Sequence, residues 1–317
     1  MSKEALVAVR RCNSYDHEEV YWACKSAVEC IGGLRSIFGR GDVVLLKPNM
    51  LSIAPPESAA ITHPELIRAS ILLLRGIGCT PIVADSPAFG TVMQVAEASG
   101  IAKVCSELDV PILTWRSTAH INHPFYRSRY LVVGKEAVQV DGIINIPKFK
   151  THIQVGFSGA IKNMFGCLPG KRKTVMHMTT GLNEYRFAEM LLSYCVALRP
   201  SLTIVDAIVA MHKNGPRKGE PYRLGMILAS RDAIAADVAL AGIVRMPNAH
   251  QLLLEVAREH ELPTAFSENV FVDAEGLELP NEPFVFPRLV GTGFNPGRVI
   301  KSIIKNWITM LTGRMPE

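Results

Sequence analysis

Six cations gather in residues 142–183, a segment without any aspartate or glutamate. They are Lys148, Lys150, Lys162, Lys171, Arg172 and Lys173. The whole chain carries 34 basic and 29 acidic residues, so without these six the remainder, with 28 basic residues, is close to neutral. A local excess of positive charge attracts negatively charged molecules. The segment therefore predicts a site for an anionic ligand.

The segment is densest at residues 145–152 and 159–166, and residues 148–152 follow the strand predicted at 143–146. Alternate residues of an extended chain face the same way, so Lys148 and Lys150 can converge on one ligand. A lysine ammonium suits phosphate or carboxylate, and a histidine titrates near neutral pH. We expect Lys150 and His152 to act in proton transfer, and Lys148 and Thr151 to bind the substrate. A solvated basic turn is the alternative.

Lys162 and Asn163 fall in a short predicted helix over residues 158–164, with glycines on both sides. Glycine permits close backbone approach, and the free N–H groups of a helix start attract anions. Both residues are therefore predicted to bind the substrate. Residues 166–172 do not form a P-loop, because the spacing differs and Arg172 stands where Ser or Thr is required.

Polar side chains also follow other apolar runs that read as strands. The further substrate-binding candidates are Lys47, Asn49, Asp85, Ser86, Asp206 and Asn214. In open parallel sheets ligands bind beyond the carboxyl ends of the strands, so these groups are expected to share a cleft. His63, at the start of a predicted helix, is a further candidate for proton transfer. Capping of neighbouring turns and helices is the alternative role for each group.

The elements that must position these groups alternate between strand and helix. Strands are predicted at 5–9, 43–46, 81–84, 111–115, 143–146, 201–206, 226–229 and 270–272, and helices at 16–38, 64–76, 92–98, 102–108, 184–198, 233–245 and 248–260. Residues 131–133 and 138–140 suggest an antiparallel pair. This order predicts an α/β fold with a mostly parallel sheet and helices on both faces, and it allows a smaller second lobe.

Two parts are expected along the chain. Residues 1–245 form the α/β domain with the cationic cleft, and residues 246–317 contain C-terminal helices, a Pro-rich stretch at 280–296 and an amphipathic helix at 298–311. The Pro-rich stretch reads as a linker or a surface-hugging excursion. The 298–311 helix has basic residues beside an apolar stripe, so it can pack on its own domain, form a homodimer or contact a membrane surface.

Composition limits the classes of protein that fit. The seven cysteines are scattered without a C-x-x-C pair, and no run approaches the ~18 apolar residues of a membrane span, which together indicate a cytoplasmic protein. No metal-binding motif occurs, so no metal ligands are assigned. Nucleic acid is an unlikely partner, because aromatic residues are sparse in the basic segment and no reader motif is present.

The motifs above, taken in order, resemble the family called domain of unknown function 362. The resemblance lies in Lys47-Pro-Asn49, Thr62-His-Pro-Glu65, Asp85-Ser-Pro87, Ile146-Pro-Lys148-Phe-Lys150-Thr-His152, Gly159-Ala-Ile-Lys162-Asn-Met-Phe-Gly166, Val205-Asp206, Met211, Asn214-Gly-Pro216, Gly219 and Ile227-Leu-Ala-Ser-Arg-Asp232 through Asp237. Many members of that family carry ferredoxin-type clusters in an added cysteine-rich segment. This chain has no such segment, so the resemblance does not bring an iron–sulfur cluster with it.

The residues favour an enzyme that acts on a small phosphate- or carboxylate-bearing substrate by acid/base chemistry. Two alternatives stay open: an iron–sulfur or redox-associated accessory protein, and a non-catalytic anion-binding module. The sequence indicates no particular cofactor, although Mg²⁺ recruited with a phosphorylated substrate is compatible with it.

Overall fold

A computed structural model describes residues 3–125, 130–170, 172–173, 183–275, 277 and 279–291. Its centre is a ten-stranded sheet in the order β12-β1-β11-β10-β7-β2-β3-β4, with β8 attached to β10 and β9 attached to β8. The strands are β1 (Ala5–Arg11), β2 (Val43–Pro48), β3 (Thr80–Ala84), β4 (Ile112–Leu113), β7 (Gly142–Ile146), β8 (Lys148–His152), β9 (Gly156–Ser158), β10 (Leu202–His212), β11 (Glu220–Ser230) and β12 (Val270–Glu275). Among the described strands of this sheet, the β1–β11, β10–β11 and β8–β9 pairs are antiparallel and the other pairs are parallel, so the predicted mostly parallel sheet is confirmed.

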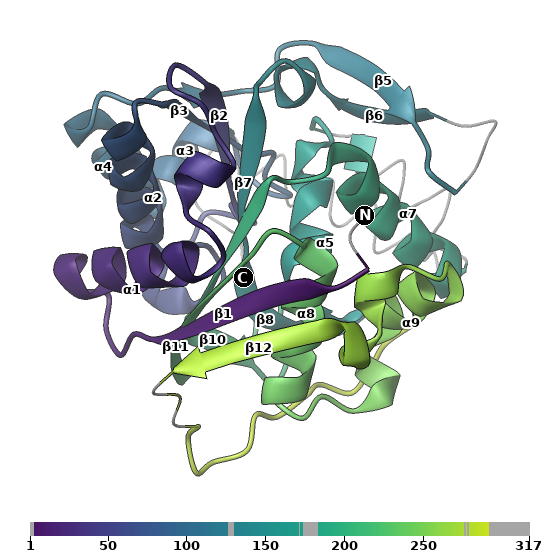
Figure 1. Cartoon of the computed structure of the whole chain (residues 1–317). Coiled ribbons are helices and arrows are strands. Elements are labelled where there is room, and N and C mark those ends of the chain that lie inside the picture. Colours follow the sequence, from purple (N-terminus) through teal and green to yellow (C-terminus); the bar gives the residue numbers. More distant parts are fainter. Residues whose placement is uncertain are drawn as a thin grey trace.

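Helices cover both faces of this sheet (Figure 1). They are α1 (His17–Cys30), α2 (Pro64–Ile77), α3 (Val92–Ala98), α4 (Ile101–Glu107), α5 (Ala160–Asn163), α7 (Glu184–Leu198), α8 (Ala233–Ile243) and α9 (Leu252–Glu259). The first four pack with one apolar core, and α5, α7, α8 and α9 pack with a second core on the opposite face. The prediction of helices on both faces is therefore confirmed.

Some predicted boundaries are wrong. The first helix was expected to reach residue 38 but ends at Cys30, because Gly32 and Gly33 adopt the left-handed backbone that helices exclude. A second, two-stranded sheet pairs β5 (Thr118–Asn122) with β6 (Tyr130–Gly134). Residues 131–133 are thus antiparallel as expected, but 138–140 is not their partner, since the chain turns into a 3-10 helix at Lys135–Val138.

Strand β10, which has 11 residues like β11, pairs with both β7 and β8. It runs six residues beyond the predicted end at 206, because its second half pairs with β11 in a hairpin. On its other side β10 pairs first with β7, where Thr203 faces Asn145, and then with β8, where Asp206 faces Lys148. Pro147 separates β7 from β8; it has no N–H to donate, but its carbonyl accepts from the Asp206 amide at 2.9 Å.

Residues 279–291, here called the strap, cross the surface without forming a helix or strand. The strap carbonyl of Val285 accepts from the Lys213 amide at 2.7 Å, and the strap amide of Val290 donates to Ile153 at 2.7 Å. Phe284 stacks on Phe149 of β8, with ring centroids 5.3 Å apart. Up to residue 291 the Pro-rich stretch therefore lies along the surface, the second of the two expected alternatives; residues 292–296 lie outside the described residues.

C-terminal to residue 245, β12 joins the edge of the same sheet, parallel to β1 (Figure 1). The division into parts at residue 245 stays a prediction. The predicted 298–311 helix lies outside the described residues. In the part of the chain that is described, none of the helices combines the length and apolar character that crossing a bilayer requires.

Candidate functional site

Five lysines meet where β2, β3 and β7 end. This lysine cluster consists of Lys47, Lys148, Lys150, Lys162 and Lys173. Within the described residues, two carboxylates form ion pairs with it, Asp85 and Asp206. Positive charge therefore exceeds negative charge in a region where the first three lysines are at most 1% exposed.

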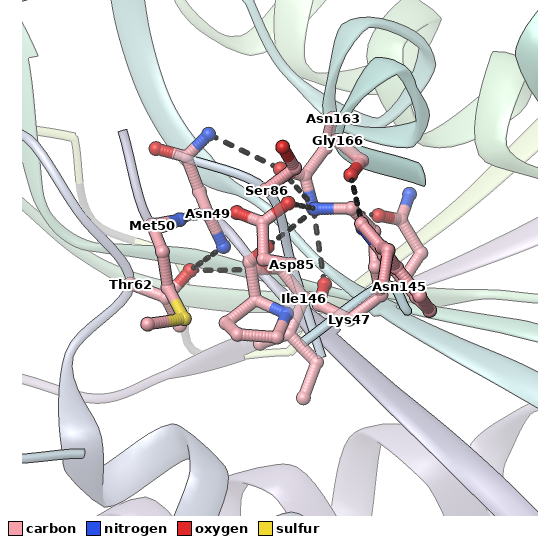
Figure 2. Close-up of polar contacts among 12 residues, drawn as sticks. Lys47, Asn49, Met50, Thr62, Asp85, Ser86, Asn145, Ile146, Asn163 and Gly166 are labelled. Atoms are coloured by element: carbon pink, nitrogen blue, oxygen red, sulfur yellow. Dashed lines mark hydrogen bonds and ion pairs between the residues drawn. The ribbon is translucent and has the colours of Figure 1, made fainter. Parts of the chain in front are cut away.

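Lys47 forms the first ion pair, with its ammonium 2.7 Å from Asp85 Oδ1 (Figure 2). The same ammonium donates to the Pro48 carbonyl at 2.6 Å, and Asp85 Oδ2 accepts from the Met50 amide at 2.7 Å. Gly166 lies against this pair, and a Cβ there would come within 2.0 Å of Asp85 Oδ1. The close approach of the 166 backbone thus explains why glycine occupies this position.

Three asparagines from separate elements surround Lys47 (Figure 2). Asn163 Nδ2 on α5 donates to the Lys47 carbonyl at 3.1 Å and to Asn145 Oδ1 on β7 at 2.8 Å. Its Oδ1 accepts from Asn49 Nδ2 at 3.1 Å and from the Lys47 ammonium at 3.4 Å. These amides hold α5 against the ends of β2 and β7, and so fix where Lys162 lies.

Lys148 forms the second ion pair, 3.0 Å from Asp206 Oδ2. Burial lowers the pKa of Lys148, and the Asp206 carboxylate opposes that shift. Tyr15 completes the group: its hydroxyl accepts from Lys148 at 2.7 Å and donates to Asp206 Oδ1 at 2.8 Å. Burial and the carboxylate both raise the pKa of Tyr15, so the phenol stays protonated.

His63 stacks on Tyr15, with ring centroids 3.6 Å apart, and its backbone amide donates to Asp206. Its Nδ1 accepts from the Glu65 amide at 3.3 Å, which makes His63 the N-cap of α2. Burial lowers the His63 pKa to about 4, so the ring is neutral near pH 7 with its proton on Nε2. The hydroxyl of the preceding residue, Thr62, donates to the Ile146 carbonyl and accepts from the Asn49 amide.

Lys150 is the buried lysine whose acceptors are both uncharged. Its amine donates to Asn49 Oδ1 at 2.6 Å and to the Ala60 carbonyl. Burial, followed by the neighbouring charges of Lys162 and Lys148, holds its pKa well below the ordinary value. This environment disfavours the ammonium form.

Lys162, on α5, is partly buried and has no hydrogen-bond or ion-pair partner among the residues that the structure describes. Burial and then the charge of Lys47 lower its pKa to about 8. Lys173 donates to the Ser86 carbonyl, and burial lowers its pKa to about 8 as well. Like Lys148 and Lys150, these two amines therefore have pKa values below that of an ordinary lysine.

A surface hollow of about 610 Å³ opens beside the lysine cluster. Its lining includes Asp85, Ser86, Trp115, Gly170 and Arg172. The Ser86 hydroxyl accepts from the Gly170 amide at 2.9 Å, whereas the cap of α3 is Thr91. The capping alternative for Asp85 and Ser86 is therefore wrong.

The remaining predicted residues lie further along the same loops and strands. The Thr151 hydroxyl donates to the Lys213 carbonyl at 2.8 Å and so fastens the β10–β11 turn to β8. His152 Nδ1 accepts from the Gln154 amide at 3.2 Å, and Asn214 is exposed in the turn. Their functional roles stay predictions.

The start of α5 is not open to an external anion, contrary to expectation. Asp237 of α8 accepts from the Ala160 amide at 2.6 Å and from the Ile161 amide at 2.9 Å. Burial raises the Asp237 pKa to about 7. The protein's own carboxylate therefore caps this helix, and Gly159 leaves it the space, since a Cβ there would meet Asp237 Oδ1 at 2.0 Å.

Sequence reasoning missed two members of the site. Asn145 is a single polar residue inside an apolar strand, and that contrast could have identified it. Tyr15 precedes α1 in a loop without a motif, and its partners Lys148 and Asp206 are more than 130 positions away. Within the described ranges, no group of three or more His, Cys, Asp or Glu side chains is arranged to hold a metal ion.

The fold and the site define an α/β protein that has a mostly parallel sheet and a lysine cluster at the ends of its strands. The chain belongs to the domain of unknown function family DUF362, whose pattern matches residues 44–242. It is 33% identical over 302 residues to the thylakoid-associated protein sll1697 of Synechocystis sp., with 95% of this chain and 94% of that protein covered.

A solved structure shares the fold. The lactate racemase apoprotein from Thermoanaerobacterium thermosaccharolyticum matches with a TM-score of 0.50 and 16% sequence identity. The match covers 75% of this chain and 56% of the racemase chain, so this protein spans little more than half of the racemase's length. At this identity, the similarity shows the fold alone.

Proposed function

We propose that this protein is an enzyme that binds a small phosphate- or carboxylate-bearing substrate at the lysine cluster and transfers a proton on it. The observation that carries the proposal is the ammonium of Lys162, partly buried and without a partner in the described part of the chain. Buried charge is costly unless it is paired. A bound anion would supply the missing counter-charge.

The proton-transfer part is supported by amines whose pKa values are lowered. A general base works best with a pKa near the operating pH. Lys150, whose pKa is held well below the ordinary value by burial and by the neighbouring charges of Lys162 and Lys148, suits that role. His63, by contrast, is proposed to donate a hydrogen bond from Nε2, because its Nδ1 already accepts from the Glu65 amide.

The test compares melting temperatures in inorganic phosphate and in chloride at equal ionic strength. A ligand that binds the folded state raises its stability, so phosphate is expected to raise the melting temperature of the natural protein. Lys162→Met should abolish that rise without lowering the stability in chloride, because the change removes a charge that repels Lys47. Lys218→Met, in an exposed loop position, is the matched control and should keep the response.

Two outcomes would contradict the proposal. The first is the same melting temperature in phosphate, in small carboxylates and in chloride. The second is visible absorbance with stoichiometric iron in protein purified without oxygen, which would favour the accessory-protein alternative.

We also propose that the protein resides in the cytoplasm. All seven cysteines are free thiols, and six of them are buried, as is common in a reducing compartment. The Synechocystis relative is described by its name as thylakoid-associated, so fractionation of cells that produce this chain is the direct test. Recovery in the membrane fraction would contradict a cytoplasmic location.

A further inference from the structure

We propose that Lys150 is a nucleophilic amine that forms an imine with a carbonyl-bearing anionic substrate of the 2-oxo acid class. This inference rests on the proposed function, because the same lysine cluster would hold the carboxylate of that substrate. It assigns a covalent step to one residue and narrows the class of substrate.

The hydrogen bonds of Lys150 fit an uncharged amine. A neutral amine has two N–H groups and one lone pair, whereas an ammonium has three N–H groups and no lone pair. Lys150 has two acceptors, Asn49 Oδ1 and the Ala60 carbonyl, and its side chain is 1% exposed. Two acceptors satisfy the neutral amine and leave its lone pair free. Lys47 and Lys148 differ, because each pairs with a carboxylate.

The charges around Lys150 also favour its uncharged form. Lys162, Lys148 and Lys47 all disfavour a further positive charge at this position. The Asp85 carboxylate favours a positive charge on Lys150. However, it is already paired with the Lys47 ammonium at 2.7 Å. A lysine that is desolvated and lies beside another cation is an activated nucleophile.

Lys162 supplies the reason for choosing a 2-oxo acid. It has no partner among the described residues, and it is the cation that acts most strongly on Lys150. In a 2-oxo acid the carboxylate is bonded directly to the carbonyl carbon. A carboxylate paired with Lys162 would therefore bring an electrophilic carbon towards Lys150.

The proposed step is balanced without an oxidant or a cofactor. The Lys150 lone pair attacks the carbonyl carbon, a C–N bond forms, and the π electrons move to oxygen, which takes up one amine hydrogen. The C–O bond then breaks, and the oxygen leaves as water with the second amine hydrogen while the C=N bond forms. Protonation of the imine acidifies the neighbouring C–H, which suits the proposed proton-transfer chemistry.

Reductive trapping tests this assignment on the full-length protein. Pyruvate is added together with sodium cyanoborohydride, and the modified residue is located by peptide mass mapping. We expect one dominant adduct, on Lys150, that excess phosphate suppresses by at least ~10-fold through competition for Lys162. Lys162→Met should lower the yield, and Lys218→Met should not. Lys150→Met should lose the dominant adduct. Because the modified residue is mapped on the natural protein, the test remains valid even if this variant does not fold.

The result separates this inference from the proposed function. If phosphate stabilises the protein but pyruvate, oxaloacetate and 2-oxoglutarate leave Lys150 unmodified, the imine is ruled out and the anion site stands. A dominant adduct on Lys162, or equal labelling of exposed lysines, also overturns the assignment. If neither phosphate nor any 2-oxo acid has an effect, both proposals fail.

Discussion

At the scale of single residues, the lysines of the cluster differ in what balances their charge. Lys148 and Lys47 each have a buried carboxylate, Lys150 has two neutral oxygens, and Lys162 has no partner within the described residues. The same side chain therefore serves two purposes here. Paired lysines stabilise the folded site, and the unpaired ones are the candidates for chemistry.

Asp206→Asn is expected to destabilise the protein strongly. The change leaves Lys148 buried without its counter-charge and weakens the bond from Tyr15, which costs about 3–5 kcal/mol of unfolding free energy. Urea unfolding measures the loss. Glu220→Gln is the control, because it breaks the exposed pair with Lys213 and should change stability little. Equal effects of the two substitutions would contradict the buried-pair interpretation.

The lowered pKa of His63 predicts that the protein becomes less stable as the pH falls. Its pKa is about 4 in the folded protein and 6.5 in an ordinary setting, so between these values the unfolded chain binds a proton that the folded chain does not. Stability should therefore drop as the pH falls from about 6.5 to about 4, by up to ~3 kcal/mol.

The measurement compares the natural protein with His63→Asn at pH 7 and pH 4.5. Asparagine keeps an N-cap for α2 but does not titrate, so the variant should lose less stability on acidification. Asp237, whose pKa is also shifted, is present in both proteins and cancels in the comparison. Parallel losses in the two proteins would show that His63 is not the titrating group.

At the scale of elements, the site depends on how the short helix α5 is held. Its four residues are too few to be stable alone, and α8 supplies the carboxylate that caps it. The asparagine contacts then fasten its other end to β2 and β7. The position of Lys162 therefore rests on residues from three other elements.

Asp237→Ala should uncouple α5 from α8. The Ala160 and Ile161 amides would lose their acceptor, which costs about 1–3 kcal/mol and should also reduce the stabilisation by phosphate. Asp232→Ala is the control: it removes the N-cap of α8 at a cost of about 1 kcal/mol but leaves α5 in place. If both variants keep the full phosphate response, α5 does not position the anion site.

At the scale of the whole molecule, the strap ties distant segments together. Phe284 packs on Phe149 of β8 and on Tyr222 of β11, with ring centroids 5.3 and 5.2 Å apart. β8 carries Lys148 and Lys150, so the strap supports the back of the strand that presents them.

Phe284→Ala is expected to loosen this support. Loss of the aromatic contacts should cost about 2 kcal/mol and speed hydrogen exchange at the Lys213 and Val290 amides, whose hydrogen bonds join the strap to the rest of the protein. Val285→Ala, at a side chain that is 42% exposed, should leave both exchange rates unchanged. Unchanged exchange in Phe284→Ala would show that the ring contacts do not hold the strap.

Local pattern predicted much of the fold. The helices at α3 and α7 begin and end where the periodicity and caps indicate, and the apolar runs at 43–46 and 143–146 are buried strands. The local pattern did not predict where a strand ends when pairing with a distant segment decides that end. β10 extends to His212 because β11 pairs with it there.

For the site, the sequence alone determined which residue types are available: an acid-free run of cations after a buried strand, and polar groups at other strand ends. Both features are patterns of neighbouring residues, which can be read directly from the sequence. Only the tertiary structure decided which lysine has a carboxylate, that Asp237 caps α5, and that Tyr15 joins Lys148 to Asp206. Charge balance depends on contacts between residues far apart in the chain, and no local pattern encodes those distances.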